Sequence, residues 1–152
     1  MFNYYTIIKE SSPFYLYNED DSILFQIERE YKYPRYVFTI KNAQQKNILI
    51  FEVRNIFSTK TTILLQNLNE EIILEKKKLI VGGEIISIVE NFKIFGKYKS
   101  SILVNNQKVG EIKEQPIFPH KKYLISFNKK DNINFYCIIL FLIISVHFAD
   151  GI

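Results

Sequence analysis

The sequence of 152 residues predicts a mainly β protein, a sandwich or barrel of about twelve strands, with one apolar helix near its C-terminal end. Short apolar runs rich in Ile, Phe, Tyr and Val alternate with polar turn clusters at a spacing of roughly 8–12 residues, as in all-β domains. An uncharged run over Phe135–Ala149 is too long for an ordinary strand. Hydrophobic residues make up 47% of the chain and aromatic residues 15%, which excludes a disordered chain.

The apolar runs define twelve expected strands along a single domain over residues 1–152. Apolar and polar side chains alternate at Phe51-Glu52-Val53-Arg54, as expected of a half-buried strand. Asn and Asp in the connecting clusters tolerate left-handed backbone, and Gly82-Gly83 can supply positive φ for a tight hairpin. The expected strands are Phe14–Tyr17, Ile23–Ile27, Tyr36–Ile40, Ile48–Val53, Ile63–Leu65, Ile72–Leu74, Leu79–Val81, Glu84–Val89, Phe92–Phe95, Ile102–Val104, Val109–Ile112 and Tyr123–Phe127.

The segment Phe135–Ala149 contains no charged residue, glycine or proline. It would run about 50 Å as a strand and about 22 Å as a helix, so we expect a helix. Because it is apolar on every face, it is not an amphipathic surface helix. Two environments suit it: the lumen of a closed sheet, which must be filled, or a bilayer, with Lys121, Lys122, Lys129 and Lys130 on the cytoplasmic side.

The last third of the sequence contains the run Gln107–Lys113, the strand Tyr123–Phe127, a polar turn with Asp131 and a helix that ends Phe148-Ala149-Asp150. In these features it resembles the phospholipid scramblase family. The LURP-one-related proteins and, more remotely, the tubby C-terminal domain share this layout. The resemblance implies a closed antiparallel barrel of about twelve strands enclosing the hydrophobic C-terminal helix, and it implies lipid-related functions.

The sequence departs from the scramblase pattern where calcium is proposed to bind. The matching stretch, residues 128–134, has one carboxylate and two lysines, whereas calcium prefers six to eight oxygen ligands. We therefore expect no metal site there and interpret Asp131 as a turn residue. The palmitoylated cysteine cluster and the proline-rich N-terminal region of scramblases have no counterpart.

No motif in the sequence predicts catalysis. His120 and His147 are the only histidines, and no cluster of His, Cys and carboxylates has metal-ligand spacing. Cys137 is interpreted as a small buried apolar residue, and Glu19-Asp20-Asp21 as a solvated hairpin tip. A P-loop, a dinucleotide fingerprint and a nucleophile elbow are absent. We expect a non-enzymatic protein with no catalytic residues, no metal, no cofactor and no identifiable small-molecule substrate.

The charge distribution indicates an anionic partner. The net charge is +4, and residues 77–152 carry 11 basic and 6 acidic side chains. Aromatic and basic residues interleave over Tyr31–Tyr36, a pattern that can stack nucleic-acid bases but also fits a strand boundary, and we expect no nucleic-acid partner. The candidate lipid- or phosphate-binding residues are Lys76, Lys77, Lys78, Lys121, Lys122, Lys129 and Lys130.

We therefore expect a cytoplasmic binding module, peripheral to the membrane, that associates with anionic phospholipid or a lipid-like ligand at the membrane surface. Residues Met1–Tyr5 lack the features of a secretory signal, which agrees with this location. The alternative is a tail-anchored protein with a cytosolic β-domain, in which Phe135–Ala149 spans the bilayer. The oligomeric state stays open.

Overall fold

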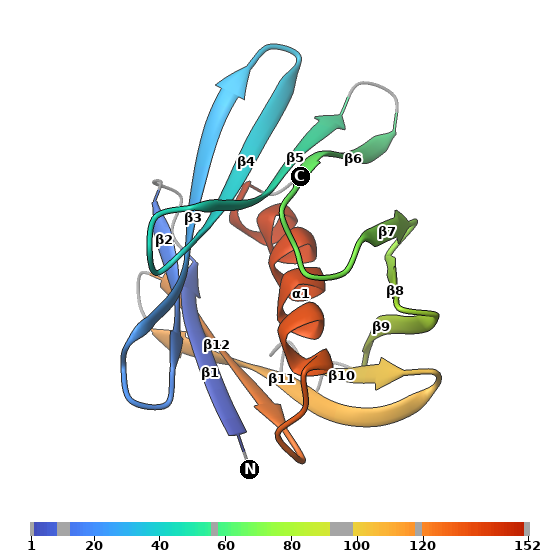
Figure 1. The fold of residues 1–152 in the computed structure, drawn as a ribbon. Coiled ribbons are helices and arrows are strands. Elements are labelled where there is room, and N and C mark those ends of the chain that lie inside the picture. Colours follow the sequence, from blue (N-terminus) through green and yellow to red (C-terminus); the bar gives the residue numbers. More distant parts are fainter. Residues whose placement is uncertain (1, 9–12, 56–57, 92–98, 118–119, 151–152) are drawn as a thin grey trace.

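A computed structural model describes residues 2–8, 13–55, 58–91, 99–117 and 120–150. Within these ranges the chain forms twelve β-strands and one C-terminal α-helix (Figure 1), which confirms the expected fold class. The elements are β1 (Phe2–Ile8), β2 (Phe14–Asn18), β3 (Ile23–Lys32), β4 (Arg35–Asn42), β5 (Asn47–Asn55), β6 (Thr59–Gln66), β7 (Ile72–Glu75), β8 (Lys78–Val81), β9 (Glu84–Glu90), β10 (Lys99–Val104), β11 (Gln107–Ile117), β12 (His120–Phe127) and α1 (Ile133–Asp150).

The strands form one antiparallel sheet in the order β6-β5-β4-β3-β2-β1-β12-β11-β10-β9-β8-β7. Strand β1 connects the first and the last strands of the chain within the sheet, because it pairs with β2 on one side and with β12 on the other. The edge strands β6 and β7 follow each other in the chain, so the sheet curls into a nearly closed barrel with a seam between them (Figure 1).

A side chain bridges the seam in place of a backbone ladder. The Gln66 amide nitrogen, Nε2, donates to the carbonyl oxygen of Ile72 at 3.1 Å. The Gln66 Oε1 atom accepts from the Ile72 backbone N–H at 2.7 Å. One amide group thus satisfies both backbone polar groups at the start of β7, as a neighbouring strand would.

The barrel interior is filled by alternate strand residues and by α1. Inward side chains such as Phe25 and Ile27 on β3 are only 1% exposed, and they follow the period of two that a pleated strand imposes. On α1, every residue from Tyr136 to Ile143 is buried, so the helix is covered on all faces. Aromatic contacts tie the helix to the wall, with ring centroids 5.4 Å apart for Phe25–Phe135 and 5.7 Å apart for Tyr123–Phe141.

Helix α1 begins two residues before the expected start and ends one residue after the expected end. Asp131 explains the earlier start, because its Oδ1 accepts from the Ile133 N–H at 3.3 Å and its carbonyl accepts from the Asn134 N–H at 3.1 Å. These bonds satisfy free N–H groups of the first turn, so Asp131 caps the helix. Among the residues that the structure describes, no helix has both the length and the apolar character that a membrane crossing requires.

Eleven of the twelve expected strands coincide with observed ones, and each observed strand is longer than expected by one to several residues. Strand β1 was not expected from the sequence. The expected strand Phe92–Phe95 lies outside the described residues. The expected positive φ at Gly82 and Gly83 is confirmed, with values of 56° and 77°.

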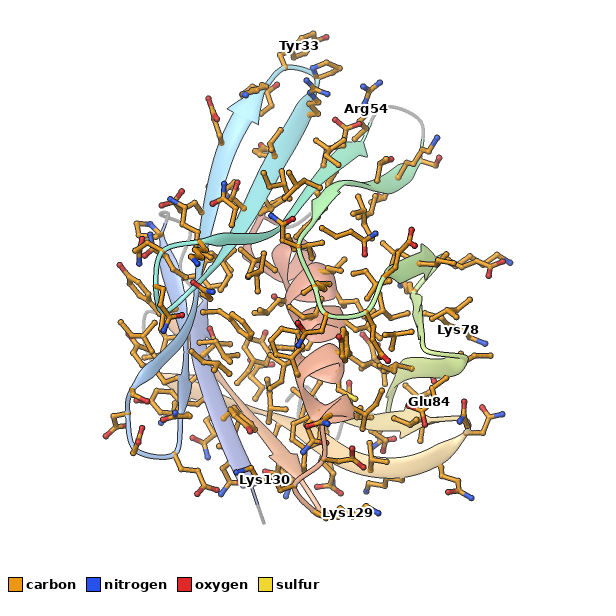
Figure 2. All side chains as sticks on the ribbon, in the orientation of Figure 1. Tyr33, Arg54, Lys78, Glu84, Lys129 and Lys130 are labelled. Carbon is orange, nitrogen blue, oxygen red and sulfur yellow. The ribbon has the colours of Figure 1, made fainter. Side chains whose placement is uncertain are left out.

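The antiparallel order sorts the connections between strands onto two ends of the barrel. The β2–β3, β4–β5, β6–β7 and β12–α1 connections lie at one end, which we call the α1-start end. The β3–β4 and β7–β8 turns lie at the opposite ends of their strands, which we call the Tyr33 end. Because β7 and β8 have only four residues each, Lys78 lies lower on the side of the barrel than Tyr33 (Figure 2). Figure 1 shows the β3–β4 turn projecting at the top, opposite the turn that leads into α1.

Candidate functional site

A pocket of about 1050 Å³ opens at the α1-start end. It lies where the first turns of α1 meet the ends of β2, β4 and β6, and its volume suits a drug-sized or larger ligand. Its apolar and aromatic lining residues are Tyr4, Leu24, Phe25, Ile48, Leu68, Phe135, Tyr136 and Ile138. Its polar and charged lining residues are Asn18, Asn42, Asn67, Asn69, Glu70, Lys130, Asp131, Asn132 and Asn134.

Several of the six pocket asparagines shape the turns around it. The side-chain oxygen of Asn42 accepts from the backbone N–H groups of Gln44 and Lys46, each at 3.0 Å. Asn18 makes the equivalent bonds in the β2–β3 turn. By contrast, the Asn69 and Asn132 side chains form no hydrogen bond within the described ranges, so their amides are available to a ligand.

One wall of the pocket is tied directly to the helix. The backbone N–H of Glu70, in the β6–β7 connection, donates to the Tyr136 hydroxyl at 3.1 Å. The Asn134 amide donates to the Lys129 carbonyl at 2.9 Å. The wall and the turn before α1 are therefore held in place by the residues that start the helix.

The seven candidate lysines do not form one site. Lys76 and Lys77 make the β7–β8 turn and Lys78 begins β8, and all three side chains are exposed. Lys129 and Lys130 are exposed at the opposite end of the barrel. Figure 2 shows Lys78 well separated from Lys129 and Lys130. Among those of the seven whose side chains the structure describes, only Lys130 lines the pocket.

The two remaining candidates lie near the start of β12. The Lys122 ammonium lies 4.4 Å from the centre of the Tyr5 ring, a cation–π contact. The Tyr5 hydroxyl donates to Asp21 Oδ1 at 2.6 Å, and this hydrogen bond raises the pKa of Tyr5 to about 12. The structure describes the backbone of Lys121 and not its side chain.

The two ends of the barrel carry opposite net charge. Among the described residues at and beside the β3–β4, β5–β6 and β7–β8 connections of the Tyr33 end, the cations outnumber the carboxylates by seven to three: Lys32, Arg35, Arg54, Lys60, Lys76, Lys77 and Lys78 against Glu30, Glu52 and Glu75. Among the described residues at and beside the connections of the α1-start end, the carboxylates outnumber the cations by seven to five: Glu19, Asp20, Asp21, Glu70, Glu71, Glu84 and Asp131 against Lys41, Lys46, Lys108, Lys129 and Lys130.

The carboxylates of the β2–β3 turn stabilise that turn. Glu19 accepts from the Asn3 N–H at 2.7 Å, and Asp20 accepts from the Ser22 N–H at 3.0 Å. The hydrogen bonds from Ser22 hold the pKa of Asp20 below its usual value. Across the described part of the chain, no three His, Cys, Asp or Glu side chains are grouped so that they could hold a metal ion.

Cys137 is expected to resist thiol reagents in the folded protein. Its side chain is fully buried, and burial raises the pKa of the thiol from 9.0 to about 12. At pH 8 we expect no modification over minutes in native protein without detergent, and stoichiometric modification in denaturant. Because the folded pKa is the higher one, we also expect stability to fall as the pH rises above about 9. Rapid labelling of the native protein would contradict the burial of α1.

No protein-family model matches the chain, and no curated protein or solved structure matches it significantly. The structure itself defines the class, a mainly β protein with a nearly closed twelve-stranded antiparallel barrel and one helix packed against its strands.

Neither the pocket nor the separation of charge between the two ends was predicted from the sequence. The polar clusters at residues 18–21, 42–47, 67–70 and 128–134 were recognised as turns, one pair of strands at a time. In an antiparallel meander every second connection lies at the same end, so these four could have been grouped in advance. The candidate lysines were chosen from the sequence without that grouping.

Proposed function

We propose that this protein is a non-enzymatic binding module that associates with an anionic phospholipid surface through the Tyr33 end of its barrel. The observation that carries the proposal is the excess of exposed cations at that end, together with the acidic character of the opposite end. Basic side chains near an anionic membrane contribute about 1 kcal/mol each. The opposite polarity of the ends would orient the molecule on such a surface.

We further propose kinship with the scramblase, LURP-one-related and tubby proteins. The support is architectural, since the resemblance implied a barrel of about twelve antiparallel strands around a hydrophobic C-terminal helix, and this chain has a nearly closed barrel of that kind. A tail anchor would require α1 to leave the barrel. The complete burial of residues 136–143 supports the binding module instead.

Co-sedimentation with vesicles tests the proposed function. We expect binding to phosphatidylcholine vesicles that contain phosphatidylserine, little binding to pure phosphatidylcholine, and weakening as salt is raised. The triple variant Lys76→Gln, Lys77→Gln, Lys78→Gln should bind on the order of 100-fold more weakly, because it removes three charges at the Tyr33 end.

The matched control is the double variant Lys129→Gln, Lys130→Gln, which removes charge from the α1-start end. We expect it to bind anionic vesicles nearly as well as the unmodified protein. Equal and negligible binding of the unmodified protein to both kinds of vesicle would refute the function. A loss of binding confined to the Lys129 and Lys130 variant would keep the function and reverse the orientation.

A further inference from the structure

The β3–β4 hairpin carries exposed tyrosines at its tip. The side chain of Tyr33 is 85% exposed and that of Tyr31 is 57% exposed, although both are large aromatic residues. Figure 2 shows Tyr33 at the outermost point of the Tyr33 end, with Arg54 of the neighbouring strand β5 close below it. A single exposed tyrosine is ordinary, but an aromatic cluster on a projecting turn indicates an interaction surface.

The exposed tyrosines are the outer part of an aromatic ladder that begins in the core. Phe51 and Phe38 are buried and stack across β5 and β4, with ring centroids 5.1 Å apart. Tyr36 follows, 6.4 Å from Phe38, and Tyr31 lies 4.8 Å from Tyr36. Tyr33 completes the ladder, 6.4 Å from Tyr31. Because the Tyr31 ring packs closely on Tyr36, it is already restrained and loses less conformational entropy on binding than a free side chain would.

Cations surround the aromatic ladder. The guanidinium of Arg29 lies 5.6 Å from the centre of the Tyr36 ring. Arg35 and Arg54 both pair with Glu52, a carboxylate that is only 5% exposed. One buried carboxylate shared by two guanidinium groups leaves a net positive charge at the tip.

We propose that Tyr31 and Tyr33 enter the headgroup region of an anionic bilayer when the Tyr33 end docks. Tyrosine is enriched at membrane–water interfaces because its ring is apolar and its hydroxyl is polar, and the neighbouring cations would pair with lipid phosphates. The β3–β4 turn projects from the barrel (Figure 1), which suits insertion into a bilayer, whereas proteins that bind single-stranded nucleic acid use a positively charged groove. This inference rests on the proposed function and identifies the residues that insert.

The sequence contains no tryptophan, so a single introduced tryptophan reports its own surroundings. In the variant Tyr33→Trp, we expect the emission maximum to move to shorter wavelength on vesicles containing phosphatidylserine, and brominated lipids to quench the emission. The matched control is Ile23→Trp, a position that is 44% exposed at the other end of β3, next to the acidic β2–β3 turn. Its emission should not change. Lys32→Gln should weaken vesicle binding about fivefold.

The possible outcomes separate the inference from the function on which it rests. If Tyr33→Trp co-sediments with anionic vesicles and its emission does not change, the tip does not insert and the proposed function stands. If neither the unmodified protein nor the variant co-sediments, both are overturned. A spectral change with a single-stranded oligonucleotide, and none with vesicles, would identify a nucleic-acid surface and refute the membrane contact.

Discussion

A chain that ends before Phe135 is expected not to fold. Helix α1 supplies eight consecutive buried residues, from Tyr136 to Ile143, that fill the barrel. Without them the inward side chains of the strands would surround a cavity far larger than a folded protein tolerates. Thermal unfolding followed by circular dichroism should show no cooperative transition for the truncated chain.

A point substitution measures the same effect without removing the helix. Leu140 on α1 is fully buried, so Leu140→Ala should lower the free energy of unfolding by about 2–5 kcal/mol. The control Leu64→Ala lies at a position on β6 that is 50% exposed, and we expect a change within about 0.5 kcal/mol. Equal stability of the two variants, or cooperative unfolding of the truncated chain, would show that α1 does not fill the core.

The substitution Gly110→Ala is expected to destabilise the protein severely. Gly110 lies on β11 between β10 and β12, and a Cβ atom there would come 2.4 Å from the carbonyl oxygen of Ser126 and 3.0 Å from the ring of Phe127. The nearer obstacle is backbone, which a change of rotamer cannot relieve, so the β11–β12 pair must separate. We expect a loss of about 3 kcal/mol in urea unfolding.

Gly83→Ala provides the comparison for the Gly110 substitution. Gly83 has a φ of +77°, but no atom lies within 4 Å of the added Cβ, so only backbone strain of about 1–2 kcal/mol is expected. If Gly110→Ala costs no more than Gly83→Ala, the close packing of β11 against β12 is wrong.

The sequence predicted the repeated hairpins and the central helix well, because both depend on local patterns. Strands such as Ile23–Ile27 and Leu79–Val81 are apolar runs between recognisable turns, and the helix is an uncharged run too long for a strand. Strand β1 was missed because its residues do not alternate cleanly. Its place depends on two partners, β2 and β12, and the second lies more than a hundred residues away.

The functional surfaces were harder to predict, because they depend on which turns share an end of the barrel. Dividing the chain at its midpoint gave a basic second half. That half, however, contributes Lys77 and Lys78 to the Tyr33 end and the acidic turn residue Asp131 to the α1-start end. The separation of charge follows the alternation of turns and not the order of residues. The tyrosines at residues 31–36 were noticed in the sequence, but only the structure shows that Tyr33 projects while Phe38 anchors the same ladder.

The position of α1 in the chain has a consequence for biosynthesis. All twelve strands precede α1 in the chain, so a ribosome synthesises the strands of the barrel before it synthesises the helix that fills the interior. At about 5–20 residues per second, the helix takes on the order of seconds to synthesise. During that time the nascent sheet exposes its apolar lining, so the newborn polypeptide should be a client for chaperones until its last helix emerges.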